Sequence, residues 1–214
     1  MSDQADTTSV WSWGLAEFRD RTASDAATPG GGSAAMVSAS IGLGLVLMAL
    51  RVTARKATDQ ADAFGVLIAS GERVLADLCD HADADIAAFE GYMAALAKPK
   101  ATEEEKAARR QALAEAAAVA TEVPLNAAQS ALEALDLARQ SVSVVSGHIV
   151  SDVGAGALLV HAAAQATLLN VDINLPSVKD ETAKADYATS RAHLAAACTA
   201  RLGDINSVVK QRLA

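Results

Sequence analysis

The chain of 214 residues is 51% apolar and 21% charged, so it can bury a core and is too apolar to be disordered. Its 18 basic and 26 acidic side chains give a net charge of −8, which argues against a nucleic-acid partner because phosphate binding needs clustered Lys and Arg. Alanine is the commonest residue and aromatic residues make up only 3%, a composition that predicts an all-α fold.

The first segment, residues 1–9, is polar and acidic and lacks the basic and apolar parts of a secretory signal. We expect a flexible tail there and a cytoplasmic protein. The spacing of Trp11, Leu15 and Phe18 then predicts a short amphipathic helix over residues 10–23.

An uncharged stretch from Thr28 to Leu50 is nearly long enough to span a membrane. It opens with Pro29 and three glycines, contains several serines, and is strongly apolar only over residues 41–50. We therefore interpret it as a helix that runs to about Lys56 and is apolar on all sides because other helices surround it. We expect no membrane partner.

A long amphipathic helix follows, with a stripe of apolar residues at steps of three, four or seven: Leu67, Val74, Leu78, Ala82, Phe89, Met93 and Leu96. Pro99 and its flanking lysines end this helix. Thr102 and Glu105 form a capping box that starts a helix over residues 103–121. Pro124 either kinks that helix or begins another one that continues to about Gln140.

The last third of the chain predicts a joint over residues 141–147, followed by a second nearly uncharged helix. Ser151 and Asp152 can cap this helix, which ends near Asn170. A turn then leads into a solvent-facing helix over residues 180–212.

These elements predict one multihelical bundle over residues 10–214, in which two nearly uncharged central helices are buried. Both central helices are rich in small residues, which allow another helix to approach closely. We therefore also expect a homodimer whose core continues across the interface.

The most unusual motif is Thr28-Pro29-Gly30-Gly31-Gly32-Ser33. Three consecutive glycines sacrifice backbone order, and they precede a helix N-terminus, whose free amide N–H groups and dipole attract anions. Two interpretations stay open: a loop that holds a ligand's carboxylate, phosphate or ring, and a tight turn capped by Ser33. The motif is not a P-loop, because no Gly-Lys-Ser/Thr follows.

Three charged positions are candidates for chemistry. Asp85 falls on the apolar stripe, where burial would raise its pKa, so it is either an acid/base group or a hydrogen-bonding anchor. Asp152 begins a buried helix, where its alternative role is that of an N-cap. Lys56, with Arg51 and Arg55, ends the first buried helix, where a cation also complements the helix dipole.

The histidines and cysteines predict no further chemistry. The four histidines (His81, His148, His161 and His193) show no HxxxH or HExxH spacing, so we expect no metal site. Cys79 and Cys198 lack CxxC spacing and are expected to be buried free thiols. Nothing resembles a nucleophile elbow.

As an ordered set, six segments resemble the cyclodeaminase family, which comprises the C-terminal half of formiminotransferase-cyclodeaminase and free-standing bacterial relatives, including methenyltetrahydrofolate cyclohydrolases. The resemblance covers about residues 11–200. It rests on Thr28–Ala35, Asp85 with Ala88-Phe89, Lys98–Arg109, Glu122–Leu125, Val150–Gly154 and Ala166–Asn174. The chain departs from the family at two places. The family usually has a lysine-rich run after the first buried helix, of which this chain keeps only Lys56, beside Arg55. Gln165 stands where relatives commonly have arginine.

The resemblance implies an all-helical dimer that binds tetrahydrofolate and processes the one-carbon unit at N5 and N10. It implies Asp152 as the acid/base group, Lys56 as proton donor or electrostatic stabiliser, and Asp85 as a group that tunes either one. The implied substrate-binding residues are Thr28, Pro29, Gly30, Gly31, Gly32, Ser33, Arg55, Ser151, Asn170 and Asn174.

The expected reaction is the hydrolysis of 5,10-methenyltetrahydrofolate to 10-formyltetrahydrofolate, with folate as substrate and with no metal and no permanently bound cofactor. We prefer it because no transferase half that would supply a formimino substrate is seen in the chain. The alternatives are a 5-formiminotetrahydrofolate cyclodeaminase that releases ammonia and a non-catalytic helical protein that binds a folate or a small anion.

Overall fold

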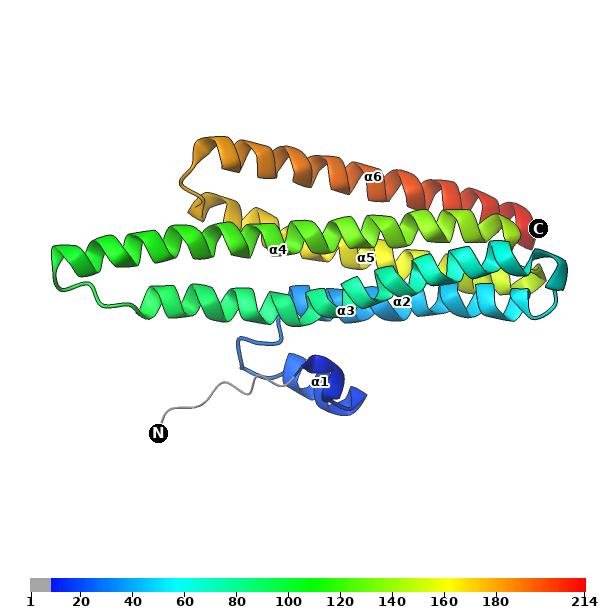
Figure 1. Ribbon diagram of the computed structural model, residues 1–214, viewed down its shortest axis with the longest axis horizontal. Helices are drawn as coiled ribbons and strands as arrows, with labels where there is room; N and C mark the ends of the chain where they lie inside the picture. The colour runs from blue at the N-terminus through cyan, green and yellow to red at the C-terminus, as the bar shows by residue number, and fades with distance from the viewer. Residues whose placement is uncertain (1–8) are drawn as a thin grey trace.

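The computed structural model describes residues 9–214, which form an elongated helical bundle without strands in that range (Figure 1). The all-α prediction is confirmed. Of the expected tail over residues 1–9, all but Ser9 lies outside the described residues. The α-helices are α1 (Leu15–Thr22), α2 (Gly31–Ala54), α3 (Ala61–Ala97), α4 (Glu103–Val144), α5 (Val150–Asn174) and α6 (Glu181–Leu213), joined by the 3-10 turns η1 (Val10–Ser12), η2 (Thr58–Gln60), η3 (Gly147–Ile149) and η4 (Leu175–Ser177).

Helices α2 to α6 run alternately up and down the bundle, and the hairpin of α3 and α4 extends past the other helices (Figure 1). Short connections between long helices make such antiparallel neighbours. The loop between α2 and α3 and the N-terminus of α5 therefore lie at one end of the bundle. The N-terminus of α2 and the C-terminus of α5 lie toward the other end.

The predicted helix over residues 10–23 is divided into η1 and α1 by an extended residue, Trp13. The reason is that η1 docks on α3: the Val10 amide donates to Asp83 Oδ1 at 2.9 Å and Trp11 Nε1 donates to the Cys79 carbonyl oxygen at 2.9 Å. Val10 is consequently the buried residue, whereas Trp11 and Leu15, on the expected apolar stripe, are exposed.

Helices α2 and α5 pack together along the middle of the bundle, with α3, α4 and α6 around them. Their closest approach is at Gly42 and Gly156, where a Cβ atom added to Gly42 would lie 2.7 Å from the Gly156 carbonyl oxygen. Both helices are long and apolar enough to cross a membrane by length and composition. However, 61% of the apolar window of α2 and 44% of the one around α5 is buried inside the protein, as for core helices.

The structure refines the boundaries predicted for the fourth and fifth helices. The Thr102–Glu105 capping box is confirmed, and Pro124 lies inside one continuous helix rather than starting a new one. The joint predicted over residues 141–147 begins only after Val144, because the buried Ser141 hydroxyl donates to the Leu137 carbonyl oxygen and stays within the helix. Helix α5 runs four residues past the expected end at Asn170.

The glycine contact between α2 and α5 predicts a sharp difference between two helical glycines. Gly42→Ala should lower the free energy of unfolding by about 1–3 kcal/mol, because its methyl group meets the Gly156 carbonyl oxygen. Gly203→Ala in α6 is the control: nothing lies within 4 Å of its added Cβ, so alanine should stabilise that helix by about 0.5–1 kcal/mol. Urea unfolding of both variants measures the difference, and equal midpoints would contradict the close crossing.

Candidate functional site

A cleft of about 340 Å³ opens where the N-terminus of α2 meets α3, α4 and α5. Its volume is within the usual range for small-molecule sites. The walls are mostly apolar, with a few polar groups among them. The lining residues are Ala27, Thr28, Gly30 and Gly31 before and at the start of α2, Asp85, Ala88, Phe89, Tyr92 and Met93 on α3, Ala120 and Pro124 on α4, and Asn170, Ile173 and Asn174 on α5.

Asp85 joins three helices at the inner wall of this cleft. Its Oδ2 accepts a hydrogen bond from the Ser33 amide of α2 at 2.9 Å, and its Oδ1 accepts one from Asn170 Nδ2 of α5 at 3.0 Å. The anion that the glycine motif attracts is therefore, in part, the protein's own carboxylate. Both interpretations of Asp85 have support, because it is a hydrogen-bonding anchor that also lines the cleft.

The electrostatic environment of Asp85 suits proton transfer. Burial raises the pKa of its carboxyl above the usual value, and the hydrogen bonds from the Ser33 amide and the Asn170 side chain partly oppose that rise. A carboxyl group whose pKa is raised in this way accepts a proton more readily near neutral pH.

Part of the glycine motif lines the cleft, and part of it packs behind the cleft wall. Thr28, Gly30 and Gly31 line the cleft, and the first N–H groups of a helix have no acceptor within their own helix, so the Gly31 amide is available to a ligand. Gly32 lies behind them: a Cβ atom there would collide with Asp85 Oδ1 and lie 2.5 Å from Asn170 Nδ2. Only glycine fits at this position.

Two residues predicted to bind substrate are buried beside the cleft instead of lining it. Pro29 is buried, and Ser33 is fully buried with no hydrogen-bond partner for its hydroxyl within the described part of the chain. Ser33 also does not cap α2; the N-cap is Gly30. What Ser33 contributes to the site is its backbone amide.

The remaining predicted residues lie at the opposite end of the bundle. Arg55 and Lys56 follow the end of α2, and Ser151 and Asp152 lie in the first turn of α5. At 1.5 Å per helical residue, Asp152 is about 27 Å from Asn170 along α5. Within one chain, therefore, Asp85 and the asparagines come together, while Asp152 and Lys56 form a second group of predicted site residues.

The prediction that Ser151 or Asp152 caps α5 is wrong. The residue at the N-cap is Ile149, because η3 leads directly into the helix, and the Ser151 hydroxyl donates back to the His148 carbonyl oxygen at 2.8 Å. Asp152 is in the first turn without capping it, where its charge still complements the helix dipole. The Asp152 carboxylate is thus not committed to a cap.

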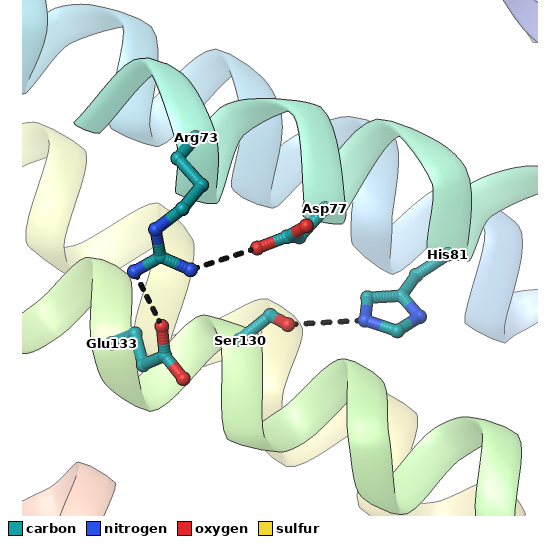
Figure 2. Close-up of polar contacts among 5 residues, drawn as sticks. All are labelled: Arg73, Asp77, His81, Ser130 and Glu133. Atoms are coloured by element: carbon teal, nitrogen blue, oxygen red, sulfur yellow. Dashed lines mark hydrogen bonds and ion pairs between the residues drawn. The ribbon is translucent and has the colours of Figure 1, made fainter. Parts of the chain in front are cut away.

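A separate polar cluster joins α3 to α4 outside the cleft (Figure 2). Arg73 forms ion pairs with Asp77 of its own helix at 3.3 Å and with Glu133 of α4 at 3.2 Å, and His81 Nε2 lies 3.0 Å from the Ser130 hydroxyl. Burial lowers the pKa of His81, which favours a neutral ring in this contact. The cluster links the two helices and lines neither of the two clefts described for the molecule.

The two cysteines are free thiols, as expected from their spacing. Cys198 is buried, and burial raises its pKa to about 11, whereas Cys79 is only half-buried. No group of three or more His, Cys, Asp or Glu residues suited to a metal ion occurs within residues 9–214.

Sequence reasoning missed the aromatic and apolar walls of the cleft. Phe89 and Met93 were assigned to the core stripe, yet they are 39% and 47% exposed because the hairpin of α3 and α4 extends beyond the rest of the bundle. Tyr92 lies outside every motif, and Ile173 lies within the Ala166–Asn174 segment but was not singled out as a site residue. Pro124 was noted as a helix breaker and as part of the Glu122–Leu125 segment, and neither observation indicated a place in the cleft wall.

Comparison with known proteins adds independent information. A family model described as formiminotransferase-cyclodeaminase matches residues 14–193. The chain is 37% identical over 166 residues to a methenyltetrahydrofolate cyclohydrolase of Methylorubrum extorquens, a match that covers 76% of this chain and 79% of that protein. It is 31% identical over 166 residues to the formimidoyltransferase-cyclodeaminase of Gallus gallus, covering 75% of this chain but only 30% of that longer protein.

The fold is also that of a solved structure. The crystal structure of formiminotetrahydrofolate cyclodeaminase from Thermotoga maritima matches with a TM-score of 0.84 and 25% sequence identity, covering 96% of this chain and 100% of that one.

The packing behind the cleft predicts opposite outcomes at two adjacent positions. Ser33→Ala should change the free energy of unfolding by less than about 0.5 kcal/mol and leave ligand binding intact, because the hydroxyl has no partner to lose. Gly32→Ala should cost about 1–3 kcal/mol and weaken binding, because its methyl group displaces Asp85 and Asn170. Thermal unfolding and ligand titration check both, and a binding defect in Ser33→Ala would show that its hydroxyl contacts the ligand.

Proposed function

Because the chain belongs to the formiminotransferase-cyclodeaminase family, we propose that this folate-dependent one-carbon enzyme hydrolyses 5,10-methenyltetrahydrofolate to 10-formyltetrahydrofolate. The observation that carries the choice of reaction is the 37% identity to a cyclohydrolase of similar length, extending over most of both chains. The cleft between α2, α3, α4 and α5 supports it with an apolar wall for a ring system and a carboxyl group at its base.

The chemistry needs few groups. Water adds to the amidinium carbon between N5 and N10, and the resulting tetrahedral carbon collapses as the ring opens. One group must accept a proton from water and another must deliver a proton to the departing nitrogen. We assign these roles to Asp152 as acceptor and Lys56 as donor or electrostatic stabiliser, with Asp85 tuning the site, and we propose no metal and no permanently bound cofactor.

A second copy of the chain would bring the two groups of site residues together. Helices α2 and α5 share an exposed face that has no Asp, Glu, Lys or Arg over residues 31–50 and 153–171. The large apolar side chains exposed on it are Ile41, Met48, Leu158, Leu159 and Leu169, and Ile173 follows just beyond it at the end of α5. A patch of this kind is rarely left open to water, and an uncharged, apolar face is self-complementary.

The symmetry of a homodimer determines which ends meet. With a two-fold axis in the interface and perpendicular to the helices, the N-terminus of α2 in one copy lies against the C-terminus of α2 in the other. Gly31 and Ala54 are equally far from the middle of α2, and Asn170 and Gly154 are equally far from the middle of α5. Such a dimer brings Lys56 and Asp152 of the partner subunit toward the Asp85 cleft.

The chain offers less cationic charge for the folate tail than the resemblance implies. Arg55 and Lys56 are exposed and lie at the dimer-facing end of α2, and Gln165 turns toward α6, where its Nε2 donates to the Ala195 carbonyl oxygen at 3.4 Å. We therefore propose that Arg55 and Lys56 together provide the cationic side of the site. The acidic chain, without basic clusters, gives no support for a nucleic-acid partner, and we propose a cytoplasmic enzyme.

The first test follows loss of the methenyl chromophore in a buffer that is not a general base. Purified protein should accelerate hydrolysis above the spontaneous rate, and Asp152→Asn should lower kcat by about 10²–10⁴-fold, the usual contribution of a general base. Asp172→Asn is the matched control on the same helix, because Asp172 forms an exposed ion pair with Arg191. Full turnover by Asp152→Asn would remove its assigned role.

The alternatives have their own signatures in the same preparation. Because a formiminotetrahydrofolate cyclodeaminase has the same fold, the second assay measures ammonia release from 5-formiminotetrahydrofolate. Saturable binding of either folate without turnover would instead identify a non-catalytic binding protein.

The shared site can be tested by complementation. If Asp85 and Asp152 act from different subunits, Asp85→Asn and Asp152→Asn are each inactive, but their heterodimer contains one intact site. Random mixing by co-expression should then restore about one quarter of wild-type activity, since half the dimers are mixed and each has one working site of two. Leu158→Glu should give monomers in light scattering and no activity. An inactive mixture of confirmed heterodimers would place both carboxylates in one subunit's site.

A further inference from the structure

Pro124 leaves one carbonyl group of α4 without its helical partner. Each carbonyl oxygen in an α-helix accepts a hydrogen bond from the amide four residues later, and proline has no amide hydrogen. Pro124 lies well inside the continuous helix Glu103–Val144, so the carbonyl group of Ala120 has no donor in its own helix. An unpaired carbonyl group at a partly buried position costs free energy unless another donor satisfies it.

The donor is the side chain of Asn174, the last residue of α5. Its Nδ2 donates to the Ala120 carbonyl oxygen of α4 at 2.6 Å, and the two residues are 54 positions apart in sequence. This bond fixes the orientation of the amide: the nitrogen faces α4, which leaves Oδ1 as the acceptor. Ala120, Pro124 and Asn174 all line the cleft.

Further hydrogen bonds on α4 and on α5 flank the bond between Asn174 and Ala120. Glu122, between Ala120 and Pro124, accepts a hydrogen bond from the Tyr187 hydroxyl of α6 at 2.5 Å, which ties this part of α4 to a third helix. The same contact raises the pKa of Tyr187 to about 12, so the phenol stays a donor at every physiological pH. One turn before Asn174, Asn170 also commits its Nδ2, in this case to Asp85.

We propose that Pro124 is a positioning residue: by withholding an amide hydrogen it reserves the Ala120 carbonyl for Asn174, whose Oδ1 then accepts a hydrogen bond from an N–H group of the substrate's heterocycle. This inference rests on the proposed function, because a reduced pterin presents such N–H groups. Each asparagine uses one hydrogen of its Nδ2 for a contact within the protein, and the printed bonds leave its Oδ1 as an acceptor. The proline that looks like a helix defect is thus part of substrate selection.

The test is a double-mutant cycle on KM for 5,10-methenyltetrahydrofolate. Pro124→Ala supplies the missing amide to Ala120, and Asn174→Ala removes the acceptor. Each should raise KM about tenfold, the effect of one lost hydrogen bond, with little change in kcat. Because both changes break the same arrangement, the double variant should be no worse than either single one. Pro99→Ala, in the loop between α3 and α4, is the control and should keep the wild-type KM.

Additive effects, or a wild-type KM in Pro124→Ala, would overturn the proposal. Thermal unfolding separates a positioning role of Pro124 from a role in folding. Pro124→Ala should unfold at an equal or higher temperature than the wild type, because alanine favours the helix interior. A loss of affinity in a more stable protein is not a folding defect.

A second readout needs no turnover. In 15N-labelled protein, the side-chain amide of Asn174, identified by its absence from Asn174→Asp, should exchange slowly with solvent in the wild type and quickly in Pro124→Ala. Equal exchange in both would show that Pro124 does not control Asn174. If the wild type neither binds nor converts the folate, the proposed function fails, while the exchange experiment still decides whether Pro124 positions Asn174.

Discussion

The close crossing of α2 and α5 at Gly42 and Gly156 is the contact on which the rest of the architecture depends. Side chains at either position would push the two central helices apart, since an added Cβ atom meets the opposing backbone carbonyl. With the helices in backbone contact and antiparallel, the N-terminus of α2 comes beside the C-terminus of α5. Asp85 of α3 can then bind a backbone amide of one helix and a side-chain amide of the other. The small residues in the core thus position the polar residues of the cleft.

Asp85 occupies part of the anion-binding capacity of the glycine motif. A glycine-rich helix N-terminus is an anion site by its nature, and here a carboxylate of the same chain takes up the Ser33 amide. Gly32 is required so that this carboxylate and Asn170 can approach the backbone, while Gly31 remains at the cleft surface. The motif therefore contributes both to packing, at Gly32, and to the cleft surface, at Gly31. Burial raises the pKa of the Asp85 carboxyl here, and the hydrogen bonds from the Ser33 amide and the Asn170 side chain are what favour its charged form.

The sequence alone predicts the helices well and the site only in part. Periodicity, the capping box and the all-α composition identified every long helix, because these signals are local. They failed at Trp11, where docking on α3 overrides the apolar spacing. They left two alternatives at Pro124, and the helix continues there because Asn174 satisfies the carbonyl that proline leaves without a donor. The walls formed by Phe89 and Met93 depend on how far the hairpin of α3 and α4 extends beyond the bundle, a tertiary property that no short motif encodes. Asp85 was recognisable because a charged residue on an apolar stripe requires a partner.

The separation between the two groups of predicted site residues is itself informative. Helices α2 and α5 each have predicted site residues at both ends and an uncharged, partly exposed face between them, a pattern that a monomeric bundle has no reason to keep. A monomer would gain solubility from charges on that face, whereas a two-fold dimer needs it apolar and needs the ends to differ, since each end meets the opposite one. The carboxylate of Asp85 at one end and the cations Arg55 and Lys56 at the other are complementary in that arrangement. Catalytic competence would then depend on assembly, and the same apolar face that completes the core would also complete the active site.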